Sequence, residues 1–178
     1  VDDVKRIVEK RAEHKNYLSY YRNFFSQYKI TADKEIFEEL VKDFAPNFKA
    51  KYSANETESQ NQNNKYFLRG SEIGSALQSL NSETKDKVFI ELSEKQIKVK
   101  YFLNQLSQEG LFVKDIDEKS IRASLSSYIR KFIEDELLTE EGNKKGLQNS
   151  PDVNKYLRMW KDAYLSKMLT TTFFDSIK

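Results

Sequence analysis

The sequence predicts a mainly α-helical protein, in which long amphipathic helices pack as an irregular bundle with one small β-hairpin near residues 88–99. Two observations carry this prediction. Apolar side chains recur at three- and four-residue steps over several long segments, which is the spacing of one helix face. β-branched and aromatic residues form one short run, Val88–Leu92, and a turn then leads back into Ile97-Lys98-Val99.

Composition sets the limits of this fold. The chain has 178 residues, enough for one domain with a real core or for two small helical lobes. Its 30 basic and 28 acidic residues alternate closely, so we expect a solvated surface of mixed charge and no nucleic-acid partner. No apolar run is long enough to span a bilayer, so the chain is predicted not to be membrane-embedded. It begins Val1-Asp2-Asp3 without Met, which indicates a piece of a longer, processed protein.

Residues 1–45 are predicted to form a segment of two helices. The first helix, residues 2–29, is rich in aromatic side chains over its second half, and these cover a wider arc than one packing stripe needs. We favour a helix that neighbours bury on two sides over a helix with a binding face. Thr31 or Asp33 caps the second helix, which ends at Pro46 because proline lacks the amide hydrogen that a helix interior uses.

Residues 46–65 are predicted to form a polar linker or mobile loop. From Ser53 to Asn64 the chain has no large apolar side chain, so this stretch cannot bury enough surface to offset the entropy of ordering it. Ordered structure is expected to resume at Tyr66, with a short helix over residues 72–80 before the hairpin.

Three helices are predicted after the hairpin. A short one over residues 101–108 is closed by Gly110. A long one begins at the cap residue Asp117 and runs to about residue 141, where Gly142 and Gly146 stop it. The last begins at Ser150-Pro151-Asp152, which combines a Ser cap, Pro at the first helical position and an acid in the first turn. Its expected packing stripe is Val153, Leu157, Trp160, Tyr164 and Met168.

No catalytic constellation is present in the sequence, so we expect no enzyme, no cofactor and no metal. His14 is the only His and lies in a charged helix, where surface exposure is the usual reading. The chain has no Cys, which excludes disulfides, thiolate zinc sites and a Cys nucleophile. Acidic clusters such as Glu134-Asp135-Glu136 are interpreted as solvated and paired with nearby lysines.

Two phrases near the C-terminus resemble a known family. Lys145-Gly146-Leu147 ends one long helix, and Ser150-Pro151-Asp152-Val153 begins the next. Together with the hairpin and Phe102 upstream, these phrases are similar to the helical chaperone domain of SurA-like periplasmic foldases, the parvulin-type peptidyl-prolyl isomerases. The resemblance covers residues 66–178, and residues 1–45 resemble it loosely. Gly142 stands where that family often has Ala, and nothing in the chain matches the parvulin domain itself.

The resemblance implies a chaperone-type module without isomerase activity. Such a module holds unfolded or partly folded envelope and outer-membrane proteins in a bacterial extracytoplasmic compartment, and it is a possible homodimer. The alternative is a helical adaptor or structural module that binds one folded partner; an enzyme with a shallow carboxylate site is a weaker alternative. Client contacts are expected from aromatic residues off the main stripes: Tyr20, Phe24, Tyr66, Phe67, Phe173 and Phe174.

Overall fold

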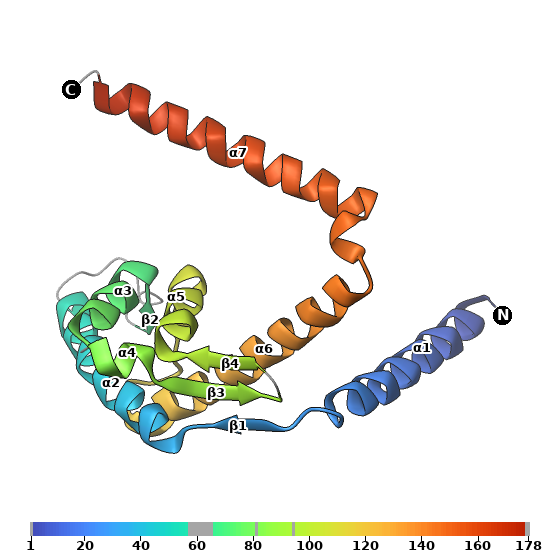
Figure 1. Ribbon diagram of the computed structural model, residues 1–178, viewed down its shortest axis with the longest axis horizontal. Helices are drawn as coiled ribbons and strands as arrows, with labels where there is room; N and C mark the ends of the chain where they lie inside the picture. The colour runs from blue at the N-terminus through green and yellow to red at the C-terminus, as the bar shows by residue number, and fades with distance from the viewer. Residues whose placement is uncertain (1, 57–65, 81, 94, 177–178) are drawn as a thin grey trace. The chain divides into compact units, whose positions relative to one another are not determined.

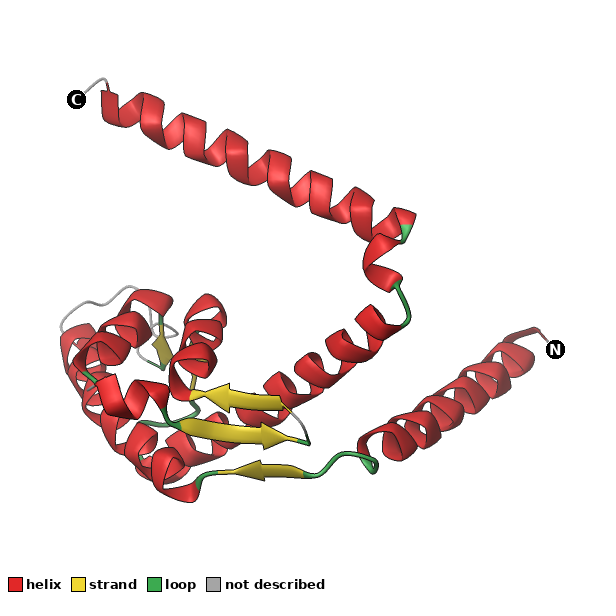
Figure 2. Ribbon diagram, viewed as in Figure 1, coloured by secondary structure: helices red, strands yellow, loops and turns green. Residues whose placement is uncertain are grey.

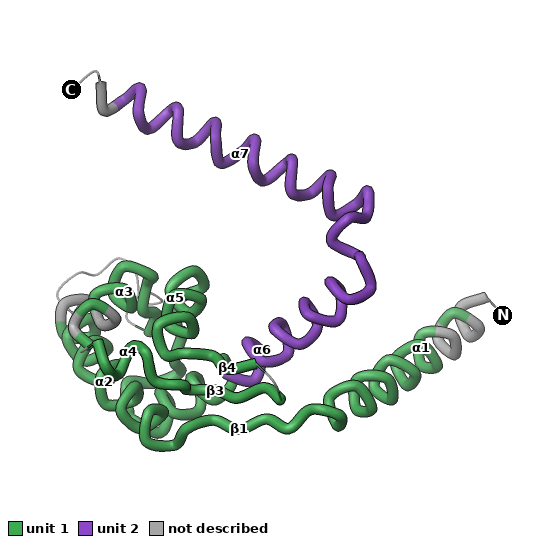
Figure 3. Tube along the Cα trace, in the orientation of Figure 1, with its two compact units in different colours: residues 1–128 green, residues 129–178 purple. Residues whose placement is uncertain are grey.

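The computed structural model describes residues 2–56, 66–80, 82–93 and 95–176 (Figure 1). Helices make up most of this chain, and the strands form one three-stranded and one two-stranded antiparallel sheet (Figure 2). The predicted mainly α-helical class with a small hairpin is therefore confirmed. The chain forms two compact units, residues 1–128 and 129–178, and the boundary falls inside the long helix α6 (Glu118–Lys144) (Figure 3).

The larger sheet lies in the first unit. Strands β3 (Val88–Leu92) and β4 (Lys95–Lys98) form the predicted hairpin, whose turn includes Ser93 at a φ of 54°. A third strand, β1 (Ile30–Ala32), pairs antiparallel with β3 and was not expected from the sequence. In β3 the buried Ile90 and Leu92 alternate with the exposed Glu91, so the face that carries Ile90 and Leu92 contributes to a core. Phe89, at a register irregularity of the β3–β4 pairing, is buried as well.

The core of the first unit is built by helices α2 (Lys34–Glu56), α3 (Gly70–Ser79), α4 (Ser82–Asp86) and α5 (Val99–Glu109) with the start of α6. Aromatic rings link these elements: the Phe102 ring lies 5.0 Å from that of Phe89 and 5.8 Å from that of Tyr128. Edge-on contacts at such distances add to the energy of burial. The largest fully buried side chains of this core include Phe44, Phe48, Phe89, Phe102, Leu40, Leu68, Ile73, Ile90, Ile97, Leu103, Leu106 and Ile121.

Helix α2 corrects two predictions. It begins at the predicted cap, because the Ile36 amide donates to the Asp33 carboxylate at 3.0 Å, but Pro46 lies inside it and does not end it. Residues 46–56 are therefore helical, and the boundary drawn at residue 45 falls within one element; residues 57–65 of the predicted linker lie outside the described chain. An internal proline costs a helix about 3 kcal/mol. Fully burying Phe48 just beyond it contributes a comparable amount, so packing keeps the helix intact.

Two side-chain interactions tie α2 to elements that follow it in the sequence. The Lys51 ammonium donates to the Phe67 carbonyl and to the Glu72 carboxylate, each at 2.7 Å. Arg122 of α6 donates to the carboxylate of Glu38. The segment predicted as residues 1–45 is therefore joined to the chain that follows it by the contact of Glu38 with Arg122 and by the β1–β3 pairing.

Gly110 closes α5 as predicted, and its amide donates to the Leu106 carbonyl at 2.8 Å. It leads into the short strand β5 (Leu111–Phe112), which pairs with β2 (Phe67–Leu68). The backbone of Gly110 has a φ of 80° and a ψ of 172°, a region that almost only glycine adopts.

Helices α6 and α7 begin at the caps predicted for them. The Ser120 amide donates to Asp117 at 2.7 Å, and the Val153 amide donates to the Ser150 hydroxyl at 3.3 Å. Gly142 lies inside α6, so it does not stop the helix as predicted. Gly146, at a φ of 72°, follows the helix end and leads into a 3₁₀ turn, η2 (Leu147–Asn149), before α7 (Pro151–Ser176).

Candidate functional site

Every described side chain of α7, from Pro151 to Phe174, is exposed to solvent. The large apolar ones have exposed fractions between 36% at Val153 and 72% at Leu169. The stripe expected to pack in a bundle is therefore open to solvent in the described structure. The exposed apolar residues of α7 are Val153, Tyr156, Leu157, Met159, Trp160, Tyr164, Leu165, Met168, Leu169, Phe173 and Phe174.

Local signals make α7 a helix. Ser150 caps its first turn, Pro151 has the backbone angle that the first helical position needs, and Asp152 places a carboxylate at the positive end of the helix dipole. These signals fix where the helix starts. Helices in water nevertheless draw most of their stability from packing an apolar face, and α7 carries such a face.

The apolar residues of α7 form two faces. At 3.6 residues per turn, the main stripe consists of Val153, Leu157, Trp160, Tyr164 and Met168. Leu165, Leu169 and Phe173 follow one another at four-residue spacing on a different face, which we call the second face. In its C-terminal half α7 is therefore apolar on two sides, so a partner seated on one side leaves the other in water.

The residue types on α7 are those that binding surfaces favour. The only Trp of the chain and both of its Met residues lie on this helix, and all three are more than half exposed. Aromatic residues and Met are enriched at protein interfaces, and Met adapts its shape to varied partners. Sequence reasoning treated Leu157, Trp160 and Tyr164 as core. The gathering of the single Trp and both Met residues on one helix was the signal that could have identified them.

The structure separates the six predicted client-binding residues into exposed and covered groups. Phe173 and Phe174 are each 61% exposed at the end of α7, and Tyr20 is 52% exposed on α1 (Asp2–Phe25). Phe24 is only 7% exposed, since it lies among the rings of neighbouring aromatic residues of the same segment. The remaining two, Tyr66 just before β2 and Phe67 within it, are half-buried. These placements favour Phe173, Phe174 and Tyr20 as contacts and disfavour Phe24.

Helix α1 carries a second aromatic group. Its aromatic rings contact one another along the helix, with centroids 5.9 Å apart for Tyr17 and Tyr21 and 4.4 Å apart for Tyr21 and Phe25. Residues 10–20 are all exposed, so the expectation that neighbours bury this helix on two sides is wrong for that stretch. Part of its aromatic surface is covered by its own neighbours, and it is therefore a weaker candidate than α7.

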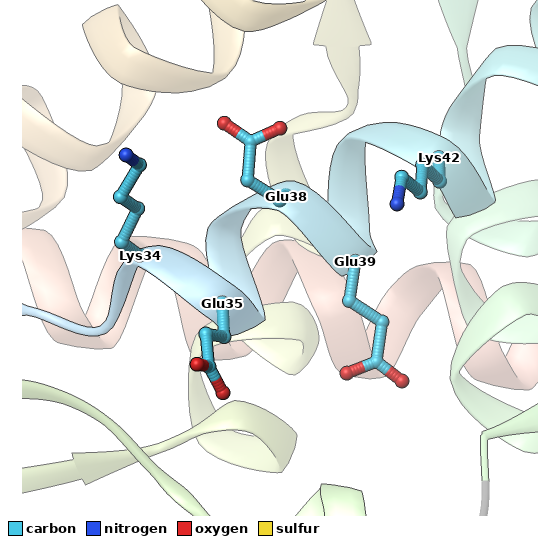
Figure 4. A pocket seen from close by; sticks show the side chains of 5 residues that line it. All are labelled: Lys34, Glu35, Glu38, Glu39 and Lys42. Carbon is cyan, nitrogen blue, oxygen red and sulfur yellow. The ribbon is translucent and has the colours of Figure 1, made fainter.

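A shallow pocket on α2 is the main alternative location for a site. It is lined by charged side chains of one helix, three glutamates between two lysines: Lys34, Glu35, Glu38, Glu39 and Lys42 (Figure 4). The hydrogen bond from Arg122 lowers the pKa of Glu38, so this carboxylate is held ionised. A base at neutral pH needs a raised pKa, and the pKa of Glu38 is shifted in the opposite direction, so Glu38 is not suited to act as one.

Within the described residues, no group of three or more His, Cys, Asp or Glu side chains is placed to hold a metal ion, and the single His, His14, is exposed on α1. None of the described helices combines the length and the apolar character that crossing a membrane requires.

Comparison with protein-family models, with curated proteins and with solved structures finds no match to this chain.

Proposed function

We propose that the chain is a chaperone-type module that holds unfolded or partly folded polypeptides through the exposed apolar residues of α7. The observation that carries this proposal is the two-sided apolar character of a helix whose described side chains are all exposed. An extended chain can follow a helix around its circumference and cover both faces. A rigid partner seated on one face cannot do so.

The size of the surface agrees with this role. Large apolar side chains have surfaces of about 150–250 Å² each, and those of α7 are mostly more than half exposed, so together they present on the order of 1,000 Å². The largest apolar patch of an ordinary soluble monomer is about 300–600 Å² and is often functional. The area on α7 is divided between two faces, so each face is comparable with such a patch, and exposed apolar surface of this extent supports binding to apolar segments of other chains.

Charge keeps such a surface soluble. Lys155, Arg158 and Asp162 lie on the side of α7 away from the main stripe, in its N-terminal half. Apolar patches ringed by charge bind apolar segments reversibly, while the charge discourages aggregation of the module itself.

The resemblance to SurA-like foldases supports the choice of client and compartment. It favours envelope and outer-membrane proteins as clients, an extracytoplasmic location and a module that does not isomerise prolyl bonds. Strands of outer-membrane β-barrels alternate apolar and polar side chains and carry girdles of aromatic residues, so their unfolded chains offer aromatic and aliphatic side chains to a helix that carries both kinds.

An aggregation-suppression assay tests the proposal. The full chain should slow the aggregation of an unfolded outer-membrane protein and of one unrelated unfolded protein. The variant Leu157→Gln/Tyr164→Gln removes two side chains of the main stripe, and Leu165→Gln/Leu169→Gln removes two of the second face. Glutamine is about as good a helix former as leucine, so α7 is retained. Lys155→Gln, on the polar side, is the matched control.

Both double variants should protect the clients less well than the control. Equal protection by all three would contradict the assignment of the function to α7. The adaptor alternative predicts a different pattern: tight binding to one folded partner, loss on changing one face only, and no protection of unfolded proteins. Circular dichroism of each variant verifies that the helical content is unchanged.

A further inference from the structure

The charges that border the main stripe of α7 are of one sign. At 3.6 residues per turn, Lys161 lies on one side of the stripe and Lys167 on the other, and both are exposed. Between Val153 and Met168 the only acid is Asp162, which lies on the opposite side of the helix. The middle of the stripe is thus an apolar and aromatic strip between two ammonium groups.

This arrangement disfavours a second copy of the same helix as the occupant. In an antiparallel pair centred on Tyr164, the two copies of Lys161 would lie along one flank of the interface and the two copies of Lys167 along the other, with no carboxylate between Val153 and Met168 on either flank. A parallel copy would also bring no carboxylate to either lysine along this stretch of the stripe. Like charges that face each other across a helix pair are destabilising.

We propose that the main stripe selects polypeptide segments in which apolar side chains are flanked by carboxylates. This inference rests on the proposed function and names the class of client segment that the same surface prefers. Apolar contact with Leu157, Trp160 and Tyr164 supplies most of the affinity. Pairing of client Asp or Glu residues with Lys161 and Lys167 supplies the preference, as charge complementarity commonly does at interfaces.

Peptide titration of the full chain tests the preference. Three Trp-free peptides share one pattern of aromatic and aliphatic residues and differ only in their flanking residues, which are Glu, Gln or Lys. Trp160 is the only Trp of the chain and lies in the stripe, so its emission reports binding at this site. We expect the Glu peptide to bind on the order of tenfold more tightly than the Lys peptide at low salt, since each exposed ion pair contributes modestly.

Two matched variants separate local from overall charge. Lys161→Glu/Lys167→Glu should reverse the order of the peptides. Lys155→Glu/Arg158→Glu makes the same change in net charge on the far side of α7 and should preserve the order. In about 1 M salt, where the Debye length is about 3 Å, the difference between the peptides should largely disappear.

Each other outcome overturns a specific claim. Equal binding of the three peptides overturns the charge preference and leaves the proposed function standing. Binding of none, together with no protection of unfolded clients, overturns both. A shift of Trp160 emission with vesicles of anionic phospholipid but with no peptide would assign the stripe to a membrane surface, and concentration-dependent dimerisation that buries Trp160 would assign it to a second copy.

Discussion

Replacing Gly110 with Ala should strongly destabilise the first unit, because both its backbone conformation and its close neighbours exclude a β-carbon. Gly110 links α5 to β5 with backbone angles that an L-residue rarely adopts. A β-carbon at this position would lie 2.7 Å from the Leu68 carbonyl oxygen and closer still to an atom of the Phe67 ring. The two costs act together, because rotating the backbone to relieve the strain would break the β2–β5 pairing.

The magnitude follows from these two terms. Holding a residue in a sparsely populated backbone region costs about 1–3 kcal/mol. Overpacking against neighbours that must move costs about 1–3 kcal/mol more. We therefore expect a loss of about 4 kcal/mol in the free energy of unfolding, which is a large share of the 5–15 kcal/mol typical of a domain.

Gly74 is the matched control for this substitution. It lies inside helix α3, and a β-carbon there would meet no atom within 4 Å. Gly74→Ala should therefore stabilise the protein by about 0.5–1 kcal/mol, since alanine loses less conformational freedom in a helix. Urea unfolding followed by far-ultraviolet circular dichroism measures both variants. Trp160 fluorescence is unsuitable here because it reports on the other unit. Equal midpoints for the two variants would refute the reasoning.

Three further predictions concern α2. Glu38→Gln should lower the free energy of unfolding at neutral pH, because the hydrogen bond from Arg122 lowers the pKa of Glu38 below 4.5. The ionised carboxylate stabilises the fold above that value, and this stabilisation is lost as the pH falls through the lowered pKa. The urea midpoints of the variant and of the unchanged protein should therefore converge in acid. Asp43→Asn should raise the free energy of unfolding at neutral pH. Burial, and after it the charge of Glu39, raise the pKa of Asp43 above 3.8, so the fold disfavours its ionised form, and a neutral Asn avoids this cost. Urea midpoints at neutral pH that show no gain would contradict this. Phe48→Ala should cost about 3–5 kcal/mol in urea unfolding, and a loss below about 1 kcal/mol would mean that packing does not hold the helix beyond its proline.

Local signals in the sequence predicted the helix starts well. Asp33, Asp117 and Ser150 each accept a hydrogen bond from an amide of the first turn, as their positions indicated. The hairpin was predictable because β3 and β4 are adjacent and bounded by a turn. These features depend on a few neighbouring residues, and a sequence shows such residues directly.

Features decided by distant residues were predicted poorly. Pro46 reads as a helix end, but the burial of Phe44 and Phe48 on either side of it keeps α2 continuous. Strand β1 has three exposed residues and exists because β3 pairs with it, so no periodicity could indicate it. The two-residue ladder of β2 and β5 is likewise too short to leave a pattern.

The sequence predicted only part of the candidate site, because the rest depends on which helix faces the fold covers. Phe173 and Phe174 were expected to be exposed because they lie off the stripe, and they are. The stripe itself was read as core, since helical spacing of apolar residues is the same whether the face meets a core or solvent. Only the fold tells the two apart, and in the described structure Leu157, Trp160 and Tyr164 are open to solvent.

Emission of Trp160 during the capture of an unfolded client tests the central claim most directly. The indole is 69% exposed, and it is the only one in the chain. When a Trp-free unfolded protein is added, the emission should shift to shorter wavelength. The shift should saturate over the concentration range in which aggregation is suppressed. The same protein in its folded state should leave the emission unchanged. Suppression of aggregation with no change in Trp160 emission would contradict the claim that α7 is the holding surface.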